Sequence, residues 1–308
     1  MSLKLETKYA PTIRSSAETG SKLCFLVEGP PGTGKSTLCG SMAEVVGAKK
    51  TLLIATLARE VESWKYKQLD VPHVLLQDTD WKPDIGHYTA DGFPEFLRLM
   101  RWLREDDDQY DAVILDSGTE LAEMAWHLAL SAHSVDSPAK MEGKSRWLPY
   151  ETLSNNLDQG IKELVTLPMT AKRPKHVAVT WHVQPPKDDQ SVEGVKKESA
   201  DHAAKGIEYE GDVLPMVRGS YRRKLGSQFP TLVYTDVLIK ANMGLSSANA
   251  RSIDVEYRLQ VRPDNERHTK LSGPLPEMQF IPNDFRALLT LVNGKAAPVT
   301  AAKSLSQK

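Results

Sequence analysis

The stretch from Leu23 to Leu38, LCFLVEGPPGTGKSTL, constrains the fold of this chain more than any other. It begins with an apolar run of strand length, continues with a glycine-rich loop at Gly29–Ser36, and ends where a helical pattern of apolar residues begins. The loop matches the P-loop pattern of Gly, four residues and Gly-Lys-Ser, and its strand and helix arrive in the order that the motif requires. The sequence therefore predicts a phosphate-binding loop between a buried strand and a helix.

Each residue type in this loop has a physical role in holding a nucleoside triphosphate such as ATP. The glycines allow backbone conformations and a close approach to phosphate that a Cβ atom would block. The N–H groups of the loop and the positive end of the helix dipole favour anionic oxygens. Lys35 would place a positive charge at the β- and γ-phosphates, and the Ser36 hydroxyl would bind Mg²⁺. The predicted nucleotide-binding residues are Gly29, Pro30, Pro31, Gly32, Thr33, Gly34, Lys35, Ser36 and Thr37.

Composition narrows the class of protein without naming a partner. The chain has 308 residues, of which 40% are hydrophobic and 26% charged, as in an ordinary soluble globular protein. A net charge of −1 does not favour a strongly basic nucleic-acid binder, although local patches matter more than totals. Cys24 and Cys39 have no metal-site spacing, so we expect both to be small buried residues. No apolar run reaches transmembrane length and the N-terminus has no signal-peptide pattern, so we expect a cytoplasmic protein without membrane contact.

Alternating strand and helix patterns predict an α/β fold with a mainly parallel central sheet. After the P-loop strand, buried strands are expected at Thr51–Thr56, His73–Gln77, Ala112–Leu115 and His176–Trp181. Thr231–Lys240 and Ile253–Arg262 follow one another without a helix, which predicts an antiparallel extension at one edge. The acidic run Glu105–Asp108 we interpret as a solvated loop. The expected division is a flexible arm at 1–20, one P-loop ATPase domain at 21–293 and a disordered tail at 294–308.

Asp116 is the predicted second metal ligand. It ends the apolar run AVIL about 80 residues after the P-loop, which is how a Walker B acid is placed. We expect its strand to lie beside the P-loop strand, so that its carboxylate joins Ser36 at Mg²⁺. The next residue is Ser117, whereas many AAA+ ATPases carry their catalytic glutamate there. On this ground the sequence argues against the AAA+ class.

Five pieces of the chain together resemble one family. They are GPPGTGKST at 29–37, a strand leading to Glu60, VILDS at 113–117, VTWH at 179–182, and YRLQVRPDNERHTK at 257–270. With these motifs the chain resembles the RecA-like phage ATPases that accompany single-strand-annealing recombination. The resemblance implies a RecA-like core, Mg²⁺-dependent ATP hydrolysis, binding to single-stranded DNA and a homo-oligomer with ATP at the subunit interfaces. It also implies a host-cytoplasmic location and, as a partner, a single-strand-binding or annealing protein.

The resemblance also assigns roles to two residues beyond the P-loop. Glu60 would be the general base that orients the attacking water, which fits the lack of an acid after Asp116. Glu62 or Glu120 could serve instead. His182, at the end of its strand, would be the polar sensor that touches the γ-phosphate and reports it to the loop that follows.

Two regions are candidates for DNA contact. The resemblance makes 183–206 the loop that faces DNA, but its acidic residues outnumber its lysines. The segment RGSYRRK, residues 218–224, combines four cations with Tyr221, which suits a surface that follows the backbone and stacks bases. The same cations suit a finger that reaches the ATP of a neighbouring subunit. The candidates for DNA contact or for such a finger are Arg218, Arg222, Arg223, Lys224, Arg267 and Lys270.

Two other functions compete with a DNA-dependent ATPase. A small-molecule kinase could use RGSYRRK as an arginine-rich lid, although the late strand pair fits a kinase poorly. A nucleotide-gated adaptor, similar to a helicase loader, would bind ATP tightly with negligible turnover. Measuring ATP hydrolysis with and without DNA distinguishes these hypotheses.

Overall fold

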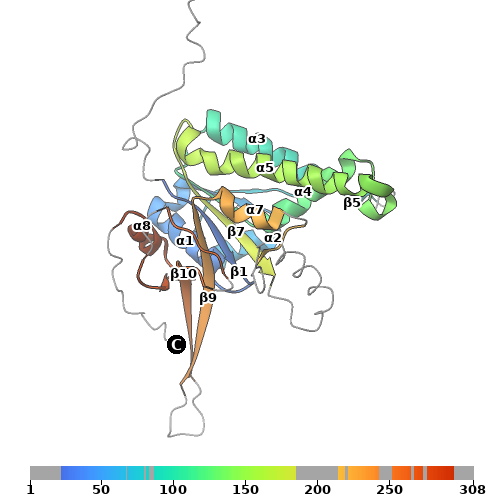
Figure 1. The fold of residues 1–308 in the computed structure, drawn as a ribbon. Coiled ribbons are helices and arrows are strands. Elements are labelled where there is room, and N and C mark those ends of the chain that lie inside the picture. The colour runs from blue at the N-terminus through green and yellow to red at the C-terminus, as the bar shows by residue number, and fades with distance from the viewer. Residues whose placement is uncertain are drawn as a thin grey trace, which may run out of the picture.

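The computed structural model describes residues 22–66, 68–79, 81–82, 87–184, 214–218, 221–242, 252–264, 267–272 and 276–294. The expected N-terminal arm, nearly all of the 183–206 loop and nearly all of the C-terminal tail lie outside these ranges. Within them, one large sheet carries helices on both faces (Figure 1).

The sheet has the strand order β11-β10-β9-β1-β7-β6-β2-β3, and the short β8 pairs with the end of β7. The strands from β9 to β3 in this order are parallel, whereas β10 at one edge pairs antiparallel with both β9 and β11. The predicted α/β class with a mainly parallel sheet and an antiparallel edge extension is therefore confirmed. The strands are β1 (Cys24–Gly29), β2 (Thr51–Ala55), β3 (His73–Leu75), β6 (Ala112–Asp116), β7 (His176–Gln184), β8 (Leu214–Pro215), β9 (Thr231–Asn242), β10 (Ser252–Gln260) and β11 (Phe280–Pro282), with β4 (Trp81–Lys82) and β5 (His87–Tyr88) paired separately.

One expectation about this sheet is wrong. The strand that ends in Asp116, β6, does not lie beside the P-loop strand β1, because β7 runs between them and pairs with both. In register, Gly29 at the end of β1 faces His182, while Leu115 of β6 faces Val179. Strand order depends on contacts between distant segments, which a linear pattern of apolar residues does not contain.

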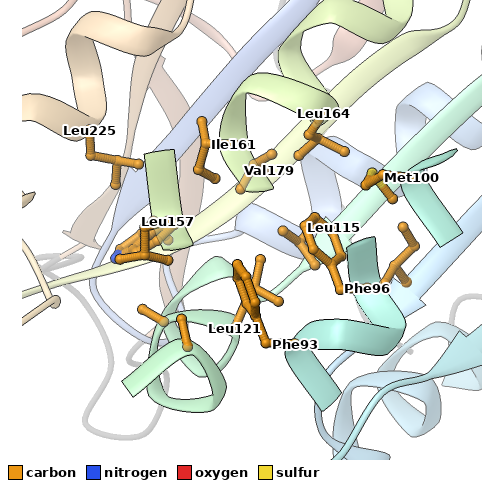
Figure 2. Close-up of a cluster of buried hydrophobic side chains, with 14 of the residues drawn as sticks. Phe93, Phe96, Met100, Leu115, Leu121, Leu157, Ile161, Leu164, Val179 and Leu225 are labelled. Atoms are coloured by element: carbon orange, nitrogen blue, oxygen red, sulfur yellow. The ribbon is translucent and has the colours of Figure 1, made fainter. Parts of the chain in front are cut away.

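The helices form two layers because both sides of each central strand are apolar. Helices α3, α4, α5 and α7 cover one face, where residues such as Phe93, Phe96 and Ile161 pack on Leu115 and Val179 (Figure 2). Helices α1, α2 and α8 pack on the other face. The helices are α1 (Lys35–Val46), α2 (Ala58–Tyr66), α3 (Gly92–Glu105), α4 (Gly118–Ala132), α5 (Leu148–Thr170), α7 (Tyr221–Gln228) and α8 (Phe285–Val292), and short 3₁₀ turns are η2 (Ala48–Lys50), η3 (Pro138–Lys140) and η4 (Gly143–Trp147).

Both cysteines are free and buried, as expected. Among the described residues, no helix has the length and apolar character needed to cross a membrane.

The acidic run Glu105–Asp108 is not uniformly solvated, which corrects its interpretation as a solvated loop. Asp107 is buried, and its carboxylate forms an ion pair of 2.7 Å with Lys175, whose side chain is completely buried. The Lys175 ammonium also donates to the main-chain carbonyls of Tyr110 and Arg173, both at 3.1 Å. The pair therefore joins the loop after α3 to the start of β7. An acidic run in a sequence does not reveal which of its members meets a buried cation.

Glu28 is a buried carboxyl in the penultimate position of β1. Its side chain is 6% exposed, and burial raises its pKa to about 8. Its carboxyl makes no hydrogen bond with any residue in the described part of the chain, so no partner compensates its charged form. At neutral pH Glu28 is therefore a protonated, uncharged residue inside the sheet.

This burial predicts a pH-dependent stability. In the unfolded chain the carboxyl ionises near its ordinary pKa of 4.5, whereas the folded protein keeps the proton up to about pH 8. The unfolded state therefore holds fewer protons between these values, so stability falls as pH rises through this window, by at most about 1.4 kcal/mol per pH unit. Urea unfolding at pH 5.5 and 7.5 should show the loss in the wild type and a smaller one in Glu28→Gln. The exposed Glu44→Gln is the control, and equal pH slopes in all three proteins would contradict the prediction.

Candidate nucleotide-binding site

The P-loop leaves β1 at Gly29 and enters α1 at Lys35. Gly34, directly before the helix, has φ 95°, a left-handed conformation that favours glycine. Gly29 is needed for a different reason, because a Cβ atom there would lie 2.2 Å from the Thr235 hydroxyl oxygen of β9. The main-chain carbonyl of Gly34 accepts the N–H groups of Thr37 and Leu38, both at 3.0 Å. The loop therefore has the backbone form that the sequence motif predicts.

A pair of threonines braces the loop against β9. The Thr33 hydroxyl lies 2.7 Å from that of Thr235 and donates to the Pro30 carbonyl at 2.8 Å. The Thr235 hydroxyl also reaches the Glu28 carbonyl at 3.2 Å. Sequence reasoning missed Thr235, because only the sheet brings a residue from so late in the chain to the P-loop.

Lys35 is buried, and its ammonium group lies against the start of the loop. Its Nζ atom donates to the carbonyls of Gly29 and Pro30, at 2.8 Å each. Burial lowers the pKa of Lys35 to about 8, and the nearby Asp116 carboxylate acts in the opposite direction. The positive charge of this buried ammonium group is only partly compensated by its surroundings. Together with the N–H groups of the loop, it favours the binding of an anion.

Asp116 meets the P-loop helix across the sheet even though β7 separates the two strands. Its Oδ2 atom accepts from the Ser36 hydroxyl at 2.9 Å, and its Oδ1 atom accepts from the Thr180 hydroxyl at 2.6 Å. Thr180 belongs to β7, the intervening strand, and sequence reasoning missed it. A hydroxyl within the otherwise apolar run HVAVTW is the signal that could have identified it. Ser36 and Asp116, the predicted metal ligands, are therefore in direct contact.

Glu60 lies in the first turn of α2, close to Asp116. Its Oε2 atom accepts the N–H groups of Thr56 and Leu57, both at 2.8 Å, while Oε1 makes no hydrogen bond within the described residues. Thr56 is tied to the end of β6, because its N–H donates to the Asp116 carbonyl at 3.0 Å. Burial, with the Asp116 charge as a smaller cause, raises the pKa of Glu60 to about 7. Such a carboxyl is poised to take a proton near neutral pH.

His182 lies level with Gly29 on the neighbouring strand. Its main-chain N–H donates to the Thr119 hydroxyl of α4 at 2.9 Å. Its Nδ1 atom is buried and has no hydrogen-bond partner in the described part of the chain. Burial, together with the nearby Lys35 charge, lowers the pKa of His182 to about 4, so the ring is neutral at physiological pH. A buried nitrogen without a partner carries a free-energy penalty that a ligand could remove.

The alternative glutamates lie differently. Glu62 is exposed on α2. Glu120, in the first turn of α4, is half-buried, and burial with the nearby Glu123 raises its pKa. Of the three candidates, Glu60 is the one whose carboxyl is tied through Thr56 to the strand of Asp116.

The cationic candidates do not gather at the phosphate loop. Arg218 forms an ion pair with Glu123 and lies over the Trp126 ring, and Lys224 forms an ion pair with Asp158. These contacts tie the two ends of RGSYRRK to α4 and α5 of the same chain, which does not favour a free kinase lid. Arg222 and Arg223 are exposed on α7.

The two late candidates contact β9 and β10. Arg267 is half-buried, with its guanidinium group over the Tyr234 ring and bonded to the Gln260 side chain at 3.0 Å. The main chain of Lys270 pairs with Leu232 in the first half of β9, and its side chain is exposed.

The residues present fit a nucleoside triphosphate with Mg²⁺. Three features meet at the loop. Gly29 leaves no room for a Cβ atom, Lys35 is buried, and the buried Nδ1 atom of His182 has no hydrogen-bond partner among the described residues. The Ser36 hydroxyl and the Asp116 carboxylate supply hard oxygen ligands of the kind that Mg²⁺ prefers.

Comparison with known proteins places the chain in a family. A sequence model of the AAA domain family matches residues 21–232, more than half of the chain, while no curated protein matches it. The match corrects the argument that Ser117, in the place of a glutamate, sets the chain apart from AAA-type ATPases. The lack of an acid at that position remains a feature of this chain.

Distant likenesses to solved structures accompany this match. The ATPase EscN of the enteropathogenic E. coli type III secretion system is 13% identical with a TM-score of 0.39, over 70% of this chain and 43% of EscN, so the chain spans less than half of that protein. The RadB recombinase is 14% identical with a TM-score of 0.33, over 77% of this chain and 79% of its own. The flagellar accessory protein FlaH of Methanocaldococcus jannaschii is 11% identical with a TM-score of 0.35, over 84% of this chain and 83% of its own. None of the three says what this protein acts on. From the family match, the chain belongs to the AAA domain family, and its P-loop joins β1 to α1 in an α/β fold.

Proposed function

We propose that this protein hydrolyses ATP with Mg²⁺ and that single-stranded DNA stimulates the reaction. The observation that carries the hydrolytic part is the hydrogen-bonded chain from Ser36 through Asp116 to Thr180, with Lys35, Glu60 and His182 around it. It supports a site in which a phosphate cradle, a metal-ligand pair and a carboxyl of raised pKa act together.

Each residue then has a defined task. Lys35 exchanges its hydrogen bonds to the loop carbonyls for the β- and γ-phosphate oxygens. Ser36 and Asp116 hold Mg²⁺, which supplies charge neutralisation at the phosphates. Glu60 orients a water molecule for in-line attack on the γ-phosphorus and accepts its proton as the bond to the ADP oxygen breaks. The His182 ring is neutral. Its Nδ1 atom, which has no hydrogen-bond partner among the described residues, can bind on the γ-phosphate side of the site.

We propose in addition that His182 transmits the state of the nucleotide. Its main chain joins two elements, since its N–H donates to Thr119 of α4 and its carbonyl accepts the N–H of Met216 after β8 at 2.7 Å. A change in the His182 side chain therefore reaches α4 and the segment that leads to RGSYRRK.

The DNA part of the proposal derives from the family resemblance and from one surface. Arg218 lies 5.3 Å from the centre of the Trp126 ring, Trp126 packs at 4.9 Å on Tyr150, and Tyr150 packs at 5.9 Å on Trp147. Trp147, at the end of this series, is 66% exposed. Trp126 is buried, so the exposed Trp147 ring is the one in this series that suits the stacking of an unpaired base. Helix α4 carries Trp126 and also carries Thr119, which contacts His182.

This proposal predicts a DNA-dependent rate that depends on Trp147. ATP hydrolysis should rise when a single-stranded oligonucleotide is added, and Lys35→Ala should abolish both basal and stimulated rates. Trp147→Ala should weaken oligonucleotide binding by roughly five- to tenfold, the loss of about one base stack, and leave the basal rate unchanged. Trp102→Ala, an exposed tryptophan on α3, is the matched control. Hydrolysis indifferent to DNA, with no binding of the oligonucleotide, would contradict the DNA part alone.

A nucleotide-gated adaptor is the second candidate, and one observation favours it. The hydrogen bonds of Glu60 to the N–H groups of Thr56 and Leu57 cap the start of α2, which is a structural task that needs no catalysis. Tight ATP binding with negligible hydrolysis, with and without DNA, would establish the adaptor.

We also propose a homo-oligomer with ATP at the subunit interfaces, in which the exposed Lys270 is a finger candidate; light scattering with and without ATP tests it.

A further inference from the structure

The direction of a bound triphosphate follows from which strands carry the catalytic groups. Glu60 follows β2, Asp116 ends β6 and His182 lies in β7, so the γ-phosphate end lies on this side of the P-loop strand β1. The nucleoside end must then leave on the opposite side of β1, where the sheet continues as β9, β10 and β11. Nothing in the P-loop motif itself identifies what meets the nucleoside there.

Two side chains from this edge press on the start of α1. A Cβ atom placed on Gly34 would lie 2.5 Å from the Asn283 Nδ2 atom and 2.9 Å from the Tyr257 Cδ1 atom, so both side chains are in contact with that glycine. Asn283 donates a hydrogen bond to the Gly34 carbonyl at 2.9 Å, which fixes the segment between β11 and α8 to the P-loop. The Tyr257 ring and the Asn283 amide therefore both lie against Gly34 at the start of α1.

At Tyr257 the apolar face of the β9–β10 extension is no longer covered by the core. Along β10, Leu259 is buried against α1 and α8, whereas Tyr257, two residues earlier on the same face, is 44% exposed. Val255 follows it outward on that face and is exposed too. The opposite face of the pair is polar, with an ion pair between Arg258 and Asp236. Figure 1 shows that the far ends of β9 and β10 project from the body of the domain. A large exposed aromatic ring therefore lies directly beside a P-loop glycine.

We propose that Tyr257 is the nucleobase platform of this ATPase, stacking its ring on the base beside Gly34, the glycine that Asn283 also contacts. The inference rests on the proposed nucleotide binding and adds the residue that recognises the nucleoside. Since every base has a π-face, stacking tolerates different bases, and the larger purines gain the most from it.

The test separates the base from the phosphates. Binding of a non-hydrolysable ATP analogue and of inorganic tripolyphosphate, both with Mg²⁺, is measured by calorimetry. Tyr257→Ala should weaken the analogue about tenfold and leave tripolyphosphate unchanged, because the stacking partner is lost while the P-loop is intact. Tyr257→Phe, which keeps the ring, should bind both ligands as the wild type does. Val255→Ala, on the same face but farther out, is the control and should change neither.

Two results would overturn the inference. Equal weakening of both ligands in Tyr257→Ala would mean that the ring only supports Gly34, and no weakening of either would mean that the base lies elsewhere. Both results presuppose a wild type that binds the analogue. A wild type that binds neither ligand would instead refute the proposed function, and the inference with it.

Discussion

Glu60→Gln is expected to reduce the turnover number for ATP about 100- to 10,000-fold, the range that loss of a general base produces. ATP affinity should stay nearly unchanged. The glutamine side-chain oxygen can still accept the N–H groups of Thr56 and Leu57, so the start of α2 is preserved. Steady-state phosphate release and equilibrium nucleotide binding, measured on the same preparation, check both halves of the prediction.

The matched control is Glu62→Gln, two residues farther along the same helix and exposed. It should hydrolyse ATP as the wild type does. Glu120→Gln provides the alternative assignment, since Glu120 is half-buried at the start of α4. A large loss in Glu120→Gln with little change in Glu60→Gln would transfer the base to α4.

The pH dependence gives a second readout of the same residue. Because the pKa of Glu60 is raised to about 7, the carboxylate that can accept a proton predominates only above that value. The turnover number should therefore fall as pH drops through about 7, with a single protonation. A rate that stays constant down to pH 5.5 would mean that the essential base ionises with an ordinary carboxyl pKa and is not Glu60.

Lys175→Met is expected to cause the largest loss of stability, about 3–5 kcal/mol in the free energy of unfolding. The substitution removes the buried ammonium group. Among the described residues, the buried Asp107 carboxylate then keeps only the N–H groups of Gln109 and Tyr110 as donors. The substitution also deprives two main-chain carbonyls of their donor. Urea unfolding followed by circular dichroism measures the effect.

Lys162→Met is the control, because Lys162 pairs with Asp158 at the surface of α5, where its side chain is 62% exposed. Its loss should stay below about 1 kcal/mol. Adding Asp107→Asn to Lys175→Met should restore part of the lost stability, since the uncompensated charge is then gone. Equal losses in the buried and surface variants would contradict a buried ion pair.

The sequence alone determined the parts of this protein that depend on neighbouring residues. The strand, glycine loop and helix around Lys35, the position of Asp116 at a strand end and the α/β class all follow from local patterns of polarity and backbone freedom. The same patterns identified the late strand pair as an antiparallel extension, because no helix separates Thr231–Lys240 from Ile253–Arg262. The strand expected at His176–Trp181 continues to Gln184 as β7, and β11 is a strand that the sequence did not reveal.

Only the tertiary structure decided which distant residues meet. It inserted β7 between β1 and β6, and so brought Thr180 to Asp116 and His182 level with Gly29. It placed Thr235 against the P-loop and turned Asp107 from an apparent surface charge into a buried ion pair. The physical reason is that strand order and the pairing of buried polar groups are set by the packing of the whole chain, whereas strand and helix formation are set mostly by the residues within each segment.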